Sequence, residues 1–197
     1  MSDPAIVTYV ALGSNGSESI TDNAEILLNA CQLIENIYGH YIKKSAFYQT
    51  PAFPKGNGPD FVNAVIGFET ASPPDEILQN LHQIEADLGR IRQKRWGQRV
   101  IDLDLIAQGQ TILPDLKTHT HWRDLSLEQQ MSETPEMLLL PHPRLQDRAF
   151  VLGPMKDIAP NWVHPILNLS VQEMWDALDE AAKAELRPLE TSKMSGL

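Results

Sequence analysis

The chain has 197 residues, 42% of them hydrophobic and 21% charged, and this composition excludes a disordered, collagenous or coiled-coil protein. Sixteen Lys and Arg against 26 Asp and Glu give a net charge of −10, which argues against a nucleic-acid binder, because such domains are normally basic. The sequence has no membrane-spanning apolar stretch, no signal-peptide pattern and only one cysteine, Cys31, so we expect a cytoplasmic protein that binds no membrane.

Strand-like and helix-like patterns alternate from the N-terminus. A β-branched and aromatic run at 6–12 predicts a buried strand. Asp22 followed by Glu25 suggests a capping box, and apolar residues at helical spacing then predict a helix that ends at Gly39. The partial alternation of residues 41–49 predicts an exposed strand.

Prolines and glycines divide the next part of the chain. Residues 51–60 hold three prolines and two glycines and therefore predict a loop. A strand pattern returns at 61–70, and the helix after it ends at Gly89. A basic segment, 90–99, then leads into a predicted strand at 100–107. The resulting βαββαβ order is the signature of a ferredoxin-like α+β sandwich with a mostly antiparallel sheet.

The C-terminal part is less regular. Residues 114–136 are polar and mixed, with a short helix predicted after Ser126. A last helix is predicted over 171–186, capped by Ser170 and Glu173.

These patterns show no repeat and no linker between domains. We expect one domain over 1–170, with an inserted segment near 114–136. A C-terminal helix and tail follow over 171–197, and the tail from Pro188 is expected to be mobile.

Two acids fall on one predicted strand. Side chains alternate along a strand, so Asp102 and Asp104 share a face with their Cα atoms ~6–7 Å apart, while Ile101, Leu103 and Leu105 face the core. Two like charges this close favour a cation between them, and Mg²⁺ prefers carboxylate oxygens. Two such ions ~3.5–4 Å apart would suit in-line displacement at phosphorus. The alternative is an edge strand that exposes two solvated carboxylates.

The segment before these acids is strongly basic. It holds five of the sixteen basic residues, contains no acid, and includes an aromatic residue, Trp96. Guanidinium groups bind phosphate in a bidentate manner, and an aromatic face can stack on a base. No Walker A motif occurs, so a nucleotide would be held by arginines and metal; the alternative is a loop that forms salt bridges with the acidic surface. The five residues are Arg90, Arg92, Lys94, Arg95 and Arg99.

A second group of residues suits a flat heterocycle. If 61–70 is a strand, Phe61 and Asn63 share a face, where one can stack on a ring and the other can hydrogen-bond its edge. Thr50-Pro51 and Phe53 precede them in the predicted loop. The alternative is that these aromatic residues belong to the core.

A third group surrounds a proline-flanked histidine. Pro141 and Pro143 fix the backbone around His142, and Arg148 adds a fork that can bind phosphate; a purely structural loop explains the pattern equally well. His119 and His121 lack a third ligand nearby and are interpreted as surface residues.

Together these stretches resemble the 6-hydroxymethyl-7,8-dihydropterin pyrophosphokinase family over residues 5–165. The matching motifs are ALGSN at 11–15, FYQTPAF at 47–53, DFVNAV at 60–65, GRIRQKRWGQRVIDLDL at 89–105 and PHPRLQDRAFVLGPMKDIAP at 141–160. The resemblance implies transfer of pyrophosphate from ATP to a pterin alcohol, with release of AMP, by an enzyme that we expect to be a monomer.

The resemblance also implies a role for each matching residue. Asp102 and Asp104 match aspartates that bind two Mg²⁺ ions. The residues that match pterin contacts are Phe61 and Phe150, which sandwich the ring, with Thr50, Pro51, Phe53 and Asn63 at its edge. Six residues match contacts to ATP and its phosphates: Arg90, Arg92, Arg99 and Arg148, which we expect to be catalytic, and Trp96 and His142, which we expect to bind ATP. Glu85 matches an acid in the region of the site, although its helix could simply expose it.

The sequence departs from the family pattern at several places, among them the basic segment, which is one residue shorter than in some relatives, and Met137 and Leu139, which stand near positions where some relatives carry polar nucleotide contacts. Gln98 replaces a usual proline, and segment 114–136 has no counterpart with a known role. Two other functions remain open: a metal-dependent nucleotidyltransferase with the same acids and arginines, and an RNA-binding or regulatory module of the same fold.

Overall fold

The computed structural model describes residues 4–39, 43–52, 58–90 and 99–190. The strands are β1 (Ile6–Ser14), β2 (Lys43–Lys44), β3 (Tyr48–Thr50), β4 (Phe61–Thr70), β5 (Asp102–Gln108) and β6 (Arg187–Pro188). The helices are α1 (Ile20–Tyr38), α2 (Pro74–Asp87), α3 (Leu116–Arg123), α4 (Leu127–Ser132), α5 (Ala149–Ile158), α6 (Val171–Ala177) and α7 (Glu180–Ala184), with a 3₁₀ turn, η1 (Leu145–Asp147).

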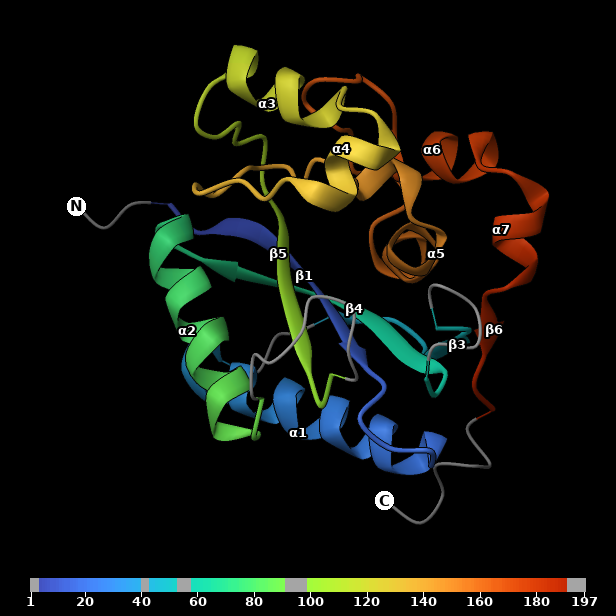
Figure 1. The fold of residues 1–197 in the computed structure, drawn as a ribbon. Helices are drawn as coiled ribbons and strands as arrows, with labels where there is room; N and C mark the ends of the chain where they lie inside the picture. Colours follow the sequence, from blue (N-terminus) through green and yellow to red (C-terminus); the bar gives the residue numbers. More distant parts are fainter. Residues whose placement is uncertain (1–3, 40–42, 53–57, 91–98, 191–197) are drawn as a thin grey trace.

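One antiparallel sheet forms the centre of the molecule. Its strand order is β5-β1-β4-β3-β6, and β2 also pairs with β4. With β2 and β3 counted as one interrupted strand, the described elements follow the predicted βαββαβ order, so the α+β sandwich is confirmed. Figure 1 shows the long central strands β1 and β4 side by side, with β5 along the edge of β1.

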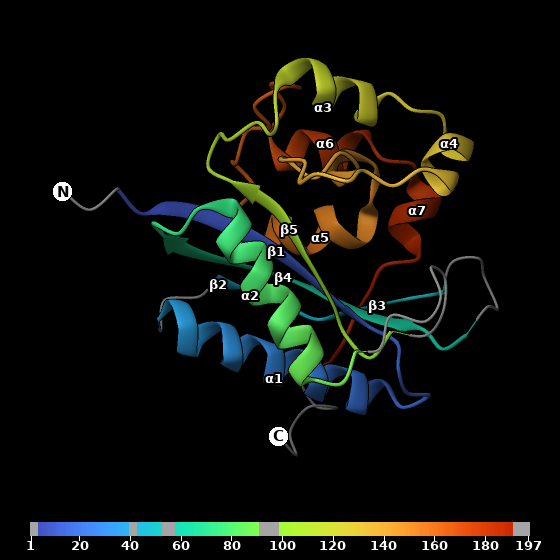
Figure 2. The same cartoon turned by 60° about the vertical axis from the view of Figure 1, so that its left-hand side comes forward.

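Helices cover both faces of the sheet. On one face, α1 and α2 enclose a core to which β1, β4 and β5 contribute alternate residues such as Leu12, Ala64 and Leu103. On the other face, α5 and α6 pack over Tyr9, Val65 and other residues of the opposite alternation. Figure 2 shows α1 below the sheet and α5 above it. Cys31 lies buried in the first core, as predicted.

The N-terminal end of α1 differs from the prediction. The helix begins at Ile20, and the Ser19 side chain accepts a hydrogen bond from the backbone N–H of Asp22. The predicted capping box at Asp22 and Glu25 is therefore wrong, because the first turn already starts before Asp22. Gly39 adopts a φ of 99° just after the helix, which explains the predicted end.

The strand predicted over 41–49 is interrupted. Only β2 and β3 form there, and residues 40–42 lie outside the described part of the chain. Between them, the buried Ser45 bonds Val65 with both its backbone and its side chain: its N–H donates to the Val65 carbonyl at 3.0 Å, and its Oγ accepts from the Val65 N–H at 3.0 Å. The hydroxyl thus replaces a backbone acceptor, and the ladder breaks at this point.

The C-terminal part also differs from the prediction. The helix predicted over 171–186 is split into α6 and α7, because Leu178 is extended and Asp179 caps a new helix. The capping box of Ser170 and Glu173 is confirmed. The tail from Pro188 is not free at its start: β6 pairs with β3, and the Leu189 N–H donates to the Phe47 carbonyl at 2.8 Å.

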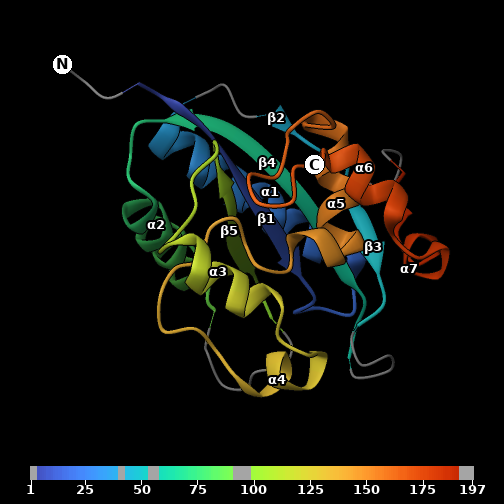
Figure 3. The same cartoon turned by 90° about the horizontal axis from the view of Figure 1, so that it is seen from above.

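Segment 114–136 folds into two short helices. α4 follows Ser126 with a complete capping box, which confirms the predicted short helix, and α3 precedes it. His119 on α3 is 0% exposed, so its interpretation as a surface residue is wrong. Figure 3 shows α3 and α4 next to one another, at the margin of the molecule. No helix within the described residues is long and apolar enough to span a membrane.

Candidate active site

The two acids of β5 project from the sheet face opposite the first core. Ile101, Leu103 and Leu105 belong to that core, as predicted, whereas Asp102 and Asp104 are partly exposed. Strand alternation therefore places both carboxylates on the face that α5 covers farther along the sheet.

The register extends this face across the next two strands, β1 and β4. Gly13 on β1 lies opposite Asp102, and the same Gly13 lies opposite Asn63 on β4. Residues that pair across antiparallel strands share a face, so Asn63 lies two strands away from the acids, ~10 Å by strand spacing. Ala11 occupies the equivalent position beside Asp104. The sheet thus offers a floor of small side chains between the acids and Asn63.

Residues of β3 and β4 border the far side of this floor. Thr50 pairs with Phe61, and the Asn63 Nδ2 donates to the Thr50 Oγ1 at 2.9 Å. Phe61 is partly exposed and belongs to neither core cluster of the described residues, which argues against the core alternative. Pro51 follows directly, whereas Phe53 lies outside the described residues.

A network of charges holds the start of β5. Glu85 is only 2% exposed; its Oε1 accepts from the Leu103 N–H at 2.7 Å and pairs with the Arg90 guanidinium. Arg90 Nη1 also lies 2.6 Å from Asp102 Oδ1, and Arg99 pairs with the other oxygen of Asp102. Burial acts to lower the pKa of Arg90, but the charges of Asp102 and Glu85 outweigh burial and raise that pKa. The expectation that α2 could simply expose Glu85 is therefore wrong.

The loop after β1 anchors the end of the basic segment. Asn15 is 2% exposed: its N–H donates to the Arg99 carbonyl at 2.9 Å, and its Oδ1 accepts from the Arg99 N–H at 2.8 Å. Its Nδ2 donates to the Pro59 carbonyl at 3.2 Å. One side chain therefore ties together the ends of the basic segment and of the proline-rich loop. Arg92 and Trp96 lie outside the described residues.

The proline-flanked histidine lies beside β5. The His142 N–H donates to the Ile106 carbonyl at 2.8 Å, and its Nδ1 accepts from the Arg144 N–H at 3.1 Å. A neutral His142 therefore carries its proton on Nε2. Burial, followed by the charges of Arg148 and Arg144, holds the pKa of His142 well below its usual range.

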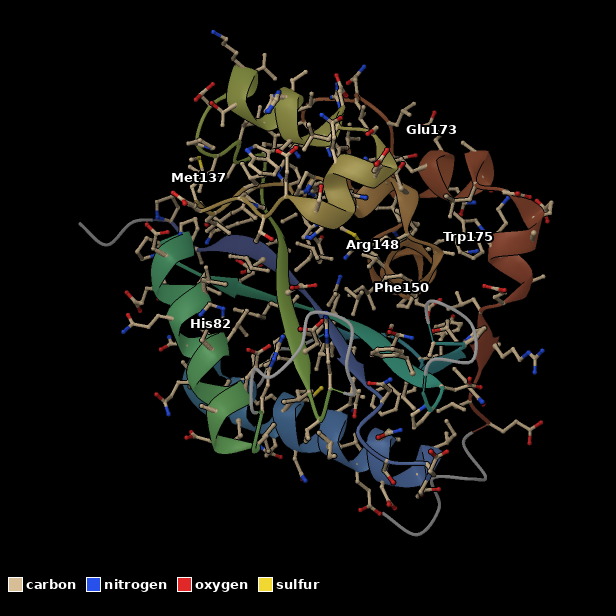
Figure 4. The ribbon with its side chains drawn as sticks, viewed as in Figure 1. His82, Met137, Arg148, Phe150, Glu173 and Trp175 are labelled. Atoms are coloured by element: carbon tan, nitrogen blue, oxygen red, sulfur yellow. The ribbon has the colours of Figure 1, made fainter. Side chains whose placement is uncertain are left out.

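The start of α5 brings a cation and an aromatic ring to the same face. Figure 4 shows Phe150 on α5 and Arg148 just before the helix, both above the sheet. The Arg148 guanidinium lies 5.5 Å from the centre of the Phe150 ring, and Phe150 is 39% exposed. An exposed aromatic ring that borders a site is available for stacking.

A pocket next to the charge network was missed by the sequence reasoning. It has a volume of about 260 Å³ and is lined by His82, Glu85, Ala86 and Arg90. His82, labelled in Figure 4, is three residues before Glu85 on α2 and so shares its side of the helix. The three-residue spacing of His82 and Glu85 is the sequence signal that could have revealed this pocket.

The carboxylates of Asp102 and Asp104 fit a divalent cation that keeps part of its water shell better than a cation ligated only by protein atoms. Within the described residues, no group of three or more His, Cys, Asp or Glu is placed to hold a metal ion. Two carboxylates on one strand face provide oxygen ligands that suit Mg²⁺, which usually keeps water or phosphate oxygens in its remaining positions. The residues present therefore fit a metal that arrives with a phosphorylated substrate.

Comparisons with known proteins show which family the chain resembles. Residues 9–160 match the family model described as 7,8-dihydro-6-hydroxymethylpterin-pyrophosphokinase (HPPK). The chain is 32% identical over 160 residues to the 2-amino-4-hydroxy-6-hydroxymethyldihydropteridine pyrophosphokinase of Haemophilus influenzae, covering 81% of this chain and 86% of that protein. It is 35% identical over 156 residues to the enzyme of the same name from Methylorubrum extorquens, covering 79% and 84%.

The comparison with solved structures concerns the fold alone. The wild-type HPPK-DHPS structure of Plasmodium falciparum matches with a TM-score of 0.61 and 16% identity, over 87% of this chain. This chain spans only 44% of that longer chain, so the likeness concerns the fold of one part. On the family match and the two bacterial relatives together, the chain belongs to the 7,8-dihydro-6-hydroxymethylpterin-pyrophosphokinase family and is an ATP-dependent diphosphokinase of folate biosynthesis.

Proposed function

We propose that this chain transfers pyrophosphate across the sheet face formed by β5, β1 and β4. ATP would place its phosphates over Asp102 and Asp104, and the pterin would lie over Asn63 and Phe61. The observation that carries this proposal is the strand register of β1 with β4 and β5. It puts the acids of β5 and the Asn63 side chain of β4 on one face, with Gly13 and Ala11 of β1 between them. Small side chains between two binding regions leave space for the reacting atoms.

The pterin side would be defined by stacking and by an amide. Phe61 is partly exposed on β4 and Phe150 is exposed on α5, so each presents a ring face to a flat heterocycle. Asn63 and Thr50, already hydrogen-bonded to each other, would supply donors and acceptors for its edge. Pro51 and Phe53 would complete this side.

The nucleotide side would be defined by cations. Arg90 and Arg99 flank Asp102, and Arg148 lies at the start of α5 near His142. Fixed positive charge at these positions would stabilise the negative charge that gathers on the phosphate oxygens in the transition state. His142 would donate a hydrogen bond from its Nε2–H. Arg92 and Trp96 are proposed to contact ATP from the basic segment.

In the proposed reaction, the pterin hydroxymethyl oxygen attacks the β-phosphorus of ATP. The bond from that phosphorus to the oxygen shared with the α-phosphorus breaks, and AMP leaves. Two Mg²⁺ ions on Asp102 and Asp104 would supply charge neutralisation on the attacking and leaving oxygens. We assign no general base, because positioning and electrostatics supply most of the catalysis of phosphoryl transfer.

Incubation with ATP, Mg²⁺ and 6-hydroxymethyl-7,8-dihydropterin tests the proposal. We expect stoichiometric AMP and a pyrophosphorylated pterin. Release of pyrophosphate with a pterin–AMP adduct would instead identify a nucleotidyltransferase. We further propose that the enzyme is cytoplasmic, which its role in folate biosynthesis supports, and that it is a monomer; sedimentation velocity would measure the assembly state.

The metal assignment has its own test. Asp104→Asn removes one charge from a partly exposed side chain that has no hydrogen-bond or ion-pair partner among the described residues. We expect transfer to fall by at least a hundredfold while the thermal unfolding curve stays unchanged, since a surface substitution costs only about 0.5 kcal/mol. The exposed Glu69→Gln is the matched control. Turnover of Asp104→Asn at the wild-type rate would refute the metal assignment.

A further inference from the structure

A buried histidine of segment 114–136 contacts the loop that carries His142. His119 lies on α3, is 0% exposed, and its Nε2 is 2.6 Å from the Pro141 carbonyl oxygen. A carbonyl oxygen only accepts hydrogen bonds, so Nε2 carries the proton and donates. His119 Nδ1 has no partner among the described residues, which is consistent with this tautomer.

The backbone holds the same loop from its other side. The Leu140 and Leu113 backbones pair with each other, the His142 N–H donates to the Ile106 carbonyl, and the His142 carbonyl accepts from Leu145 at 2.9 Å. These bonds leave the Pro141 carbonyl to be satisfied from α3. A buried carbonyl without a donor destabilises the folded state, so the His119 bond contributes to the choice of this loop conformation.

A chain of ring contacts fixes His119 relative to the sheet. The His119 and His164 rings are edge-to-face with centres 6.4 Å apart, His164 contacts Trp162 at 5.8 Å, and Trp162 contacts Tyr9 at 6.2 Å. Tyr9 belongs to the central strand β1. Trp162 Nε1 also donates to the Gly109 carbonyl at 3.0 Å. His119 is therefore held by buried contacts that lead to the middle of the sheet.

We infer that His119 is a positioning residue for the nucleotide side of the site, and that α3 is a part of the catalytic framework. His119 holds the Pro141 carbonyl and thereby sets where His142 presents its Nε2–H. This inference rests on the proposed function, because it assumes that His142 contacts the nucleotide. A group held in place before binding loses less conformational freedom when the ligand arrives, which favours affinity.

Two amide variants test the inference with almost the same chemistry. In His119→Gln, the Nε2 amide reaches the position of the histidine Nε2 and keeps the bond to Pro141. In His119→Asn, the amide is one methylene shorter and leaves that carbonyl without a donor. We expect the Asn variant to bind a non-hydrolysable ATP analogue with Mg²⁺ about tenfold more weakly in calorimetry, and to raise the KM for ATP similarly. The Gln variant should stay within twofold of wild type.

The KM for the pterin and a third variant separate positioning from general damage. His164→Asn disturbs the same buried cluster but leaves the His119–Pro141 bond, and its affinity for the ATP analogue should match wild type. A rise confined to the KM for ATP in His119→Asn supports the inference. Equal affinities of the Asn and Gln variants, or parallel rises in both KM values, would overturn it.

The same calorimetry separates this inference from the proposed function. If the wild-type chain does not bind the ATP analogue, the proposed function fails. If wild type binds it and the Asn variant binds it equally well, only the role of His119 fails. Circular dichroism of each variant verifies that it is folded before binding is compared.

Discussion

At the scale of single residues, Glu85 connects the structure of the site to its charge. It accepts from the Leu103 backbone and pairs with Arg90, which in turn contacts Asp102. A buried acid with a paired guanidinium is costly to break on one side only, because the remaining charge loses its partner. Glu85 thus fixes an arginine next to the proposed metal ligands.

Replacing Glu85 tests this connection. Glu85→Gln keeps an oxygen for the Leu103 N–H but removes the charge that faces Arg90. We expect the free energy of unfolding to fall by about 2 kcal/mol, since hydrogen bonds to charged groups contribute about 1.5–3 kcal/mol. Urea unfolding measures the change. The control is Glu76→Gln, an exposed acid on the same helix; an equal loss in both variants would contradict the role of the buried pair.

Asn15 provides a second test at this scale. Its side chain bonds both Arg99 and Pro59, which end the two loops beside the site. Asn15→Ala removes both bonds, so we expect kcat/KM for both substrates to fall about tenfold, equivalent to about 1.4 kcal/mol. Steady-state kinetics give the answer. Asn36→Ala, at an exposed position of α1, should keep wild-type values, and unchanged kinetics of Asn15→Ala would show that the two loop ends need no common anchor.

At the scale of secondary structure, the sequence patterns predicted those features that depend only on residues close together in the chain. Alternation along one strand placed Asp102 and Asp104 on one face, because the period of a strand needs no knowledge of its neighbours. The burial of Glu85 and His119 was not predictable in this way. Their partners, Leu103 and Pro141, are distant in the sequence, and no local pattern shows that the chain brings them together.

The formation of α5 also depends on contacts between residues that are distant in the sequence. No helix was predicted over α5, which contains Gly153 and Pro154, two residues of low helix propensity. In the structure a Cβ on Gly153 would lie 2.2 Å from Leu186 and 3.0 Å from Trp175, so the glycine permits close packing of α5 against the C-terminal elements. Tertiary contacts therefore outweigh helix propensity at this position.

The buried histidine pair predicts a pH dependence of stability. Burial, then the charges of His119 and Arg123, lower the pKa of His164 to about 4. An unfolded histidine titrates near about 6.5, so between these values the unfolded state binds more protons than the folded state. Stability is therefore full above pH 6.5 and is lost as pH falls toward 4, by up to about 1.4 kcal/mol per pH unit. Urea unfolding of wild type and His164→Asn across this range should show a shallower slope for the variant; identical slopes would contradict it.

At the scale of the whole molecule, the active face is open because the two layers of helices differ in extent. α1 and α2 cover one face, whereas α5 and α6 cover the other face around Tyr9, Val65 and Ile106. The acids of β5 and the Asn63 side chain lie on this second face beyond those residues. Loop ends held by Asn15 and by His119 then border the open part. The same packing that buries the second core thus defines where substrates can lie.

The C-terminal segment of the described chain returns to the edge of the sheet. β6 pairs with β3, and Leu189 packs against the first core while its N–H bonds the Phe47 carbonyl. β3 ends at Thr50 and is followed directly by Pro51, and we propose that both residues line the pterin. A chain that ends at Leu186 loses this edge, so we expect the KM for the pterin to rise about tenfold while the KM for ATP stays within twofold of wild type. A chain that ends at Glu190 keeps these contacts and serves as the matched control. Equal rises in both KM values would mean that the C-terminal strand stabilises the whole fold and does not selectively position the pterin side.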